Sequence, residues 1–364
     1  MDTLASIEAL QLQITEDTKE LESLVTEYYA DEYVGISIES FDVKRKGILS
    51  RIWEFIKRIG ASVLRVFGLL GDTTQTLRGS LDSLDRSLVQ LKGKSGKGAY
   101  VTIGNTANSL LVANQLPQSP GEYINHLNRL NDTIVTIVKL HLPAVRATAT
   151  ALSKAYASRT SDKLTLMNNI VSAAHQIRLE RLIGPLQCKE LSGDSRFART
   201  RPIYKGPDLI GNRSIIMDIP YQTTPGYASD YDRARQTSET RISFTTTVGG
   251  DRLGSDASVR PASYNDLRDM ITGLRKVLDS IDTYPSKGLE SEVTALEKSY
   301  KALSSEMSSY SGPRNEERYL EASAAILTAF STWVANPHTQ LLTSSLATVR
   351  AMITMINAQR NNLG

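Results

Sequence analysis

Apolar residues recur at steps of three and four along most of this 364-residue chain, a periodicity typical of amphipathic α-helices. The clearest case is a leucine seam that fits a helix packed against a partner, formed by Leu77, Leu81, Leu84, Leu88 and Leu91. Similar patterns predict helices over 122–140, 143–158, 162–182, 263–281, 286–310, 313–333 and from 338 to the end. Ser119-Pro120 and Ser263 to Asp266 have the composition of helix starts. The chain is therefore expected to fold mainly into packed helices.

Residues 184–261 have a different composition, with many Gly and Pro residues and short β-prone runs. The runs Arg213–Ile219 and Arg241–Val248 predict strands, and residues 99–103 predict a further short strand. The connection Tyr221–Thr240 is polar and rich in turn residues, so we expect a long exposed loop there. The predicted fold class is mainly α, a helical bundle with a small antiparallel β insertion.

Charge is divided unevenly along the chain. Residues 1–39 hold ten acids and one base, a net charge of −9, whereas the other 325 residues hold 41 bases and 29 acids, a net charge of +12. Such a boundary in a chain whose total is only +3 suggests two parts with different partners, or two parts that are eventually separated. The plainer interpretation is an acidic helix that folds against a basic face of the body.

The acidic segment is predicted to be helical rather than a structureless tail. One apolar stripe runs along it, formed by Leu4, Ile7, Leu10, Ile14, Leu21 and Leu24. Such a helix is marginal alone and needs a partner for its stripe. Gly35 is expected to interrupt the helix and to leave a short accessible stretch that ends at Glu39.

A cationic amphipathic helix is predicted directly after this segment, over residues 40–70. It can lie on a membrane surface, bind an acidic partner helix or contact nucleic-acid phosphates, or it can be a core-facing helix with a solvated basic side. A second basic cluster lies within the β insertion, where a solvated surface is the alternative to phosphate contact. The candidate DNA- or partner-binding residues are Lys44, Arg45, Lys46, Arg51, Trp53, Lys57, Arg58, Arg65, Arg196, Arg199, Arg201 and Lys205.

Several classes of protein are disfavoured by residue usage. The single cysteine, Cys188, excludes an internal disulfide, and the four histidines show no ligand spacing, so no metal or cofactor is expected. His126, His141 and His175 lie within helical patterns and are interpreted as bundle residues. No apolar run reaches the roughly 18 residues of a membrane span, and the N-terminus lacks the pattern of a secretory signal. No catalytic motif is present, so we expect no enzyme.

These patterns divide the chain into five parts. The acidic segment covers residues 1–39, the basic helix 40–72 and a first helical block 73–183. The β-rich insertion covers 184–261, and a second helical block covers 262–364.

The order of features resembles the internal head proteins of large tailed phages, including the jumbo phages. The resemblance rests on the acidic amphipathic segment, the sequence Ser37-Ile38-Glu39, the tryptophan-containing basic helix RKGILSRIWEFIKRIGASVLRVF and the stretch Leu209–Ile219. In such phages a prohead protease cuts after Glu in a small-residue-x-Glu context. The resemblance implies a cut between Glu39 and Ser40. Ser6-Ile7-Glu8 and Ser304-Ser305-Glu306 fit the motif as well, but the charge inversion falls on Glu39.

The resemblance also implies partners and a location. The removed propeptide would direct the precursor from the host cytoplasm into the maturing capsid through capsid or scaffold proteins, and the mature part would stay inside the head with the DNA. Removal of a −9 segment would leave a +12 protein that binds phosphates without reading sequence. One alternative is a membrane- or partner-binding effector whose cationic helix is masked by the acidic one. Another is a purely structural helical protein whose acidic segment stays docked.

Overall fold

The computed structural model describes residues 3–30, 38–157, 162–191, 202–219, 229–246, 253–254, 256–285, 289–309 and 314–363. Within these ranges it gives the backbone alone for residues 22, 25–30, 38–49, 231, 308, 314 and 315. The fold is mainly α with a small antiparallel β element, which confirms the predicted fold class.

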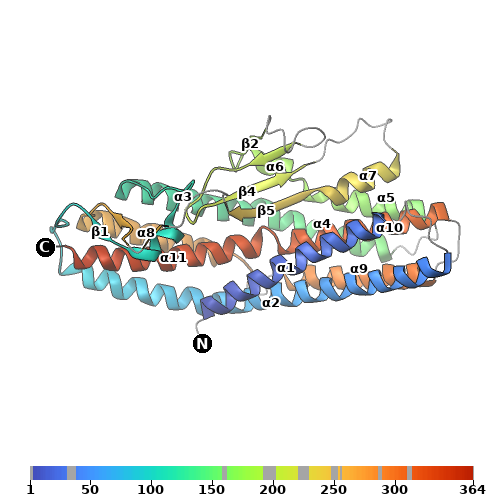
Figure 1. Ribbon diagram of the computed structural model, residues 1–364, viewed down its shortest axis with the longest axis horizontal. Coiled ribbons are helices and arrows are strands. Elements are labelled where there is room, and N and C mark those ends of the chain that lie inside the picture. The colour runs from blue at the N-terminus through green and yellow to red at the C-terminus, as the bar shows by residue number, and fades with distance from the viewer. Residues whose placement is uncertain are drawn as a thin grey trace.

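The longest element is helix α2 (Ile38–Val89), whose 52 residues correspond to a length of about 78 Å. It runs along one side of the elongated molecule (Figure 1). The basic helix and the leucine seam, expected as separate helices meeting near residue 72, are therefore one continuous helix. A Cβ atom at Gly68 or Gly71 would meet no atom within 4 Å, so these glycines lie on an open face and do not break the helix.

Helices α10 (Arg314–Ala335) and α11 (His338–Asn361) follow each other along the middle of the molecule, between α2 and the sheet (Figure 1). α11 is buried on most sides, although it is rich in Ser and Thr. Several of its hydroxyls are satisfied locally: Ser345 donates to the Leu341 carbonyl at 2.6 Å and Thr339 to that of Ala335 at 3.0 Å. Residues 316–361 are long and apolar enough to cross a membrane, but most of the stretch is buried in the protein core.

Further helices surround this pair and include α1, which lies across α2 near the front of Figure 1. They are α1 (Thr3–Ala30), α3 (Pro120–Thr136), α4 (Leu142–Ala157), α5 (Lys163–Ala174), α6 (Glu180–Ile183), α7 (Asp230–Glu239), α8 (Tyr264–Ile281) and α9 (Glu290–Ser309), with short 3₁₀ turns at Gly104–Leu110 and His175–Ile177. The predicted start of α8 is confirmed by a capping box in which Ser263 and Asp266 bind each other's backbone N–H groups.

Two predicted helix boundaries differ from the structure. α3 continues into α4 through a π-helical turn at Ile137–His141, because Pro143 has no N–H and its ring disturbs the preceding turn. The helix expected over 162–182 instead ends at Ala174 and is followed by Arg178, which takes a left-handed conformation with φ of 41°. Only the short α6 follows it.

The β insertion is a four-stranded antiparallel sheet with strand order β2-β3-β4-β5. Its strands are β2 (Lys189–Glu190), β3 (Ile203–Lys205), β4 (Arg213–Asp218) and β5 (Arg241–Thr246). β4 and β5 pair with Ile215 opposite Phe244, and both side chains are buried. A separate two-stranded ladder joins β1 (Val101–Thr102) to β6 (Ser258–Val259), as the β-prone run at 99–103 predicted for the first of them.

The prediction of an exposed loop over Tyr221–Thr240 is wrong for the second half of this segment, because residues 230–239 form helix α7. Ser229 caps this helix, accepting from the Asp232 N–H at 3.1 Å while the Asp232 carboxylate accepts from the Ser229 N–H at 3.2 Å. The polar composition of α7 concealed this helix, since among its described side chains only Ala234 and Thr237 are buried. Residues 220–228 lie outside the described part of the chain.

Candidate functional site

The apolar stripe of the acidic helix α1 is buried within the same chain. Leu4, Ile7, Ile14, Leu21 and Leu24 are at most 3% exposed, and α1 contacts α2, α10 and α11. The partner that the stripe requires is therefore the protein's own body. This arrangement supports the plainer interpretation of the sequence, an acidic helix folded against the basic part.

The matching face of α2 is buried as its stripe predicted. Ile52, Ile56 and Ile59 are almost fully enclosed. Trp53 is half-buried and stacks on Tyr300 of α9, with ring centroids 5.6 Å apart and planes 3° from parallel. The structure thus uses Trp53 for packing between helices, while its predicted role in binding DNA or a partner stays a prediction.

One ion pair joins the acidic and basic helices among the described residues. The Arg58 guanidinium lies 3.1 Å from the Asp17 carboxylate and 4.2 Å from the centre of the Phe55 ring. Burial raises the pKa of Asp17 above its usual value, and the positive charge of Arg58 opposes that rise. The contact between the two helices is therefore mainly apolar, with one partly desolvated charge pair at its edge.

The other predicted basic residues of α2 fall into three groups: one paired lysine, two exposed arginines and three bases whose side chains are not described. Lys57 pairs with Glu54 at 2.6 Å and lies 5.4 Å from the Trp53 ring centre, whereas Arg51 and Arg65 are exposed without an ion pair to any described residue. For three further bases the structure describes only the backbone, which is helical: Lys44, Arg45 and Lys46.

The predicted cleavage sequence lies at the edge of the described structure. Ser37 is outside it, and Ile38, Glu39 and Ser40 have a described backbone in the first turn of α2. The predicted interruption at Gly35 also lies outside the described residues.

The second basic cluster is not brought to α2. Arg196, Arg199 and Arg201 lie outside the described residues, and Lys205 of β3 pairs with Asp208 at 2.9 Å. The sheet that contains β3 and helix α2 lie on opposite sides of α10 and α11 (Figure 1). Any binding by Lys205 would therefore occur on a different surface from binding by α2.

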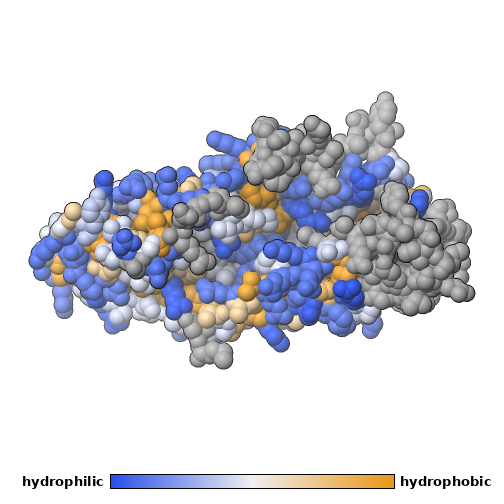
Figure 2. Space-filling view, in the orientation of Figure 1, coloured by the Kyte–Doolittle hydropathy of each residue, from blue (hydrophilic) through white to orange (hydrophobic). Residues whose placement is uncertain are grey.

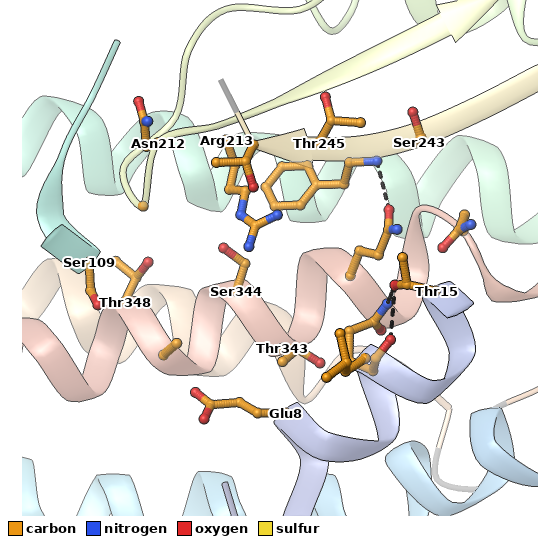
Figure 3. Close-up of a pocket in the computed structure, with 18 of the residues that line it drawn as sticks. Glu8, Thr15, Ser109, Asn212, Arg213, Ser243, Thr245, Thr343, Ser344 and Thr348 are labelled. Carbon is orange, nitrogen blue, oxygen red and sulfur yellow. Dashed lines mark hydrogen bonds between the residues drawn. The ribbon is translucent and has the colours of Figure 1, made fainter. Parts of the chain in front are cut away.

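A polar groove of about 1310 Å³, which no sequence pattern indicated, lies between α1, α11 and the edge strand β5. Figure 2 shows mostly hydrophilic residues around this hollow, and Figure 3 shows its lining. Its walls come from residues 8–19, 105–114, 211–213, 241–246 and 332–348. Because these segments are distant in sequence, only the tertiary fold reveals the groove.

Strands β4 and β5 contribute a backbone N–H group and an arginine side chain to this groove. The free edge of β5 is partly satisfied by α11, since the Phe244 N–H donates to the Gln340 side-chain oxygen at 2.8 Å. The Arg213 guanidinium points into the groove toward Ser344 (Figure 3). Burial lowers the pKa of Arg213 below its usual value.

Two of the histidines, His141 and His338, form a buried pair. His141 Nδ1 and His338 Nε2 lie 2.9 Å apart, and His338 Nδ1 lies 3.2 Å from the Tyr284 hydroxyl, all fully buried in the core. Burial lowers the pKa of His141 to about 3 and that of His338 well below its usual value. No group of three His, Cys, Asp or Glu side chains suited to a metal occurs in the part of the chain that the structure describes.

These features define the class of the protein: an elongated helical molecule with charged surfaces and a polar groove. Residues 4–358 match the model of the phiKZ-like phage internal head proteins, and the chain belongs to that family. It is accordingly a structural protein located inside the phage head, which confirms the resemblance drawn from the sequence at the level of the family. No curated protein and no solved structure is significantly similar to the chain.

Proposed function

We propose that this internal head protein is made as a precursor, that the prohead protease removes residues 1–39 after Glu39, and that the basic remainder associates with packaged DNA. The observation that carries the proposal is the docking of the acidic helix α1 on the basic helix α2. The intact chain joins a segment of net charge −9 to a remainder of net charge +12, and helix α1 of that segment packs on helix α2. Binding to phosphate is therefore weakened until the acidic segment leaves.

Cleavage alone would not release α1, because its apolar stripe is enclosed. Burial of a Leu or Ile side chain contributes roughly 1.5 to 3 kcal/mol, so five such residues hold the helix firmly. Before the cut, the connecting residues keep α1 at a high effective concentration beside α2. After the cut, the same contact becomes a bimolecular equilibrium, and dilution or a competing partner can displace α1.

A capsid or scaffold partner would meet the outer face of α1 first, since the stripe is occupied. Glu16 and Glu20 are exposed there, whereas the exposed Glu8 lines the polar groove. We infer that targeting relies on this acidic outer face. A partner that instead takes the stripe must compete with α2.

The processing step is tested on the protein as it exists in virions. Mass spectrometry should find a mature chain that starts at Ser40, and Glu39→Gln should leave it uncut because the site loses its carboxylate. Glu8→Gln, which alters another sequence that fits the motif, is the matched control and should be processed normally. A virion protein that still contains residues 1–39 would contradict the proposal.

DNA association is tested by titrating the mature chain with duplex DNA at several salt concentrations. If four to six phosphates are neutralised, affinity should fall by roughly two to three orders of magnitude between about 50 and about 200 mM salt. Replacing the exposed Arg51 and Arg65 by Gln should weaken binding and reduce the salt dependence.

The matched control replaces Arg129 and Lys139, two exposed bases of the α3 region, and should have a smaller effect at equal net charge. Vesicles with anionic lipids test the membrane alternative. Their binding would require Trp53 to leave Tyr300, which its fluorescence would report in a Trp333→Phe background. A vesicle-induced shift without DNA binding would overturn the DNA proposal.

A further inference from the structure

The groove between α1, α11 and β5 contains an unpaired cation. Arg213 is the first residue of β4, and its guanidinium makes no hydrogen bond or ion pair with any residue that the structure describes. The side chain is half-buried and aimed across the groove toward Ser344 (Figure 3). A partly desolvated cation without a partner is costly, so its retention at this place requires an explanation.

A second arginine lines the groove at the opposite end of β5, where Arg241 pairs with Asp218 of β4, and it is already engaged. Arg241 donates to the Thr240 carbonyl at 3.0 Å and to the Ser238 carbonyl. Among the described lining residues the charged groups are Glu8, Lys19, Arg213 and Arg241, so the groove has a net positive charge. Lys19 is exposed to solvent, whereas Arg213 is half-buried, so Arg213 is the partly desolvated cation that can anchor an anion in the groove.

Other polar atoms in the groove also lack partners. Thr343 and Asn336 are each 7% exposed. Neither the Thr343 hydroxyl nor the side-chain amide oxygen Oδ1 of Asn336 has a hydrogen-bond partner among the described residues. Both residues belong to the α10–α11 side that forms the floor. Buried polar groups without partners are rare in native proteins, and several in one groove point to a polar ligand.

Hydroxyls lie close to the backbone that precedes Arg213. Gly211 has φ of 90°, and a Cβ at this position would lie 3.1 Å from Thr348 Oγ1 and 3.4 Å from Ser344 Oγ. Glycine thus permits the turn before β4 to approach α11. The approach places two hydroxyl donors on the side of the groove toward which the guanidinium points (Figure 3).

We propose that this groove binds a phosphate group carried on a sugar, with Arg213 and the hydroxyls of Ser344 and Thr348 holding the phosphate. A guanidinium fork binds carboxylate and phosphate alike, but the additional hydroxyl donors can serve the further oxygens that a tetrahedral phosphate has and a carboxylate lacks. Thr343 and Asn336 would accept or donate hydrogen bonds to sugar hydroxyls. Phe244 is the one aromatic lining residue described, and it is buried, so no base is stacked and recognition is independent of base identity.

The sugar phosphate has two sources, a free molecule or a nucleic-acid strand. The proposal concerns a different surface from the exposed face of α2 and does not rest on the proposed function. Calorimetry with the full chain should use ribose 5-phosphate, a short oligothymidylate and acetate as separate probes. Binding of the first alone assigns a free sugar phosphate, and binding of the second assigns a strand; either supports the site.

Variants decide whether Arg213 is responsible. Arg213→Gln should weaken binding of the phosphorylated probe at least tenfold and leave the melting temperature unchanged or raised, because an unpaired cation has been removed. Arg129→Gln, which removes the same charge from an exposed site outside the groove, should change binding less than twofold. Ser344→Ala and Thr343→Val provide further variants that keep the fold and should each weaken binding.

Three results would overturn the proposal. The first is that neither phosphorylated probe binds the full chain at about 1 mM, a concentration at which such a site should be occupied. The second is that Arg213→Gln binds the probe as tightly as the unmodified protein does, or that Arg129→Gln weakens binding as much as Arg213→Gln. The third is that acetate binds as tightly as ribose 5-phosphate, which would mean that the groove takes a carboxylate instead.

Discussion

At the scale of single residues, the buried histidine pair makes stability depend on pH. Above pH of about 6.5 the imidazole of His141 is neutral in both folded and unfolded chains. Below it the unfolded chain takes up a proton that the folded chain refuses, because burial lowers the pKa of His141 to about 3. The free energy of unfolding should therefore decrease as pH falls, by about 1.4 kcal/mol per pH unit for each such group.

Urea unfolding between pH 7.5 and 4.5 measures this slope, and variants isolate the histidine share of it. His141→Phe, which keeps a ring of similar size, should give a shallower slope than the unmodified protein. His175→Gln is the comparison, because His175 is exposed and its Nε2 lies 3.1 Å from the Thr237 hydroxyl. Burial lowers the pKa of His175 as well, so this variant should reduce the slope, but less than His141→Phe does. Equal slopes in the unmodified protein and His141→Phe would exclude the buried histidine as the cause.

At the scale of elements, the close approach of α2 and α9 depends on Gly60. A Cβ at this position would lie 2.7 Å from Val293 Cγ1, and the branched Val side chain has little freedom to move away. Gly60→Ala gains helix propensity but overpacks the contact, so a net loss of about 1 to 2 kcal/mol in the free energy of unfolding is expected. Chemical denaturation measures it.

The same helix supplies the control, since a Cβ at Gly68 meets no atom within 4 Å. Gly68→Ala should stabilise by up to about 1 kcal/mol, because only the propensity term changes. Adding Val293→Ala to Gly60→Ala should recover part of the packing loss. If both glycine variants stabilise equally, the contact with Val293 is not tight.

The docking of α1 is tested in a similar way. Ile14 is fully buried, so Ile14→Ala should cost about 2 to 5 kcal/mol, whereas Leu12 of the same helix is 61% exposed and Leu12→Ala should change little. Hydrogen exchange in α1 reports whether the helix opens alone or with the body. Equal protection in both variants would show that the stripe does not hold α1.

Elements could be predicted from the sequence where local signals were strong. The stripe containing Ile7 and Ile14, the seam at Leu81 and Leu88, and the helix start at Ser263 are all confirmed. Predictions from local composition were wrong where a few residues determine whether a helix begins or ends. The capping box at Ser229 makes a helix of a polar segment, and the left-handed Arg178 ends one that its pattern would have continued.

At the scale of the whole molecule, the groove and the histidine pair could not be predicted. Arg213 and Thr343 meet one groove from segments 130 residues apart, and the His141 and His338 rings are 197 residues apart in sequence. Neither pair has a spacing that sequence patterns record. The charge partition, in contrast, is a property of the whole chain and was visible at once, although it did not show whether charge or apolar burial holds α1.

This last question gives a prediction for the two parts of the chain. A peptide of residues 1–39 added to a chain starting at Ser40 should bind it in trans, because α1 packs on α2 and its stripe, which includes Ile14, is buried in the intact chain. If apolar burial dominates, as the single described ion pair between Arg58 and Asp17 suggests, salt should have a modest effect. The dissociation constant should rise about tenfold or less between about 50 and about 500 mM salt.

Fluorescence anisotropy of the labelled peptide measures this constant, and two variants separate the contributions, one in the body and one in the peptide. In the body, Arg58→Gln removes the charge pair and should weaken binding slightly at low salt, with no further effect at high salt. In the peptide, Ile14→Ala should weaken binding at every salt concentration, because burial of apolar surface is not screened. A rise of a hundredfold or more with salt would instead mean that the attraction between charges of −9 and +12 holds the segment, and that cleavage inside the head releases it in proportion to ionic strength.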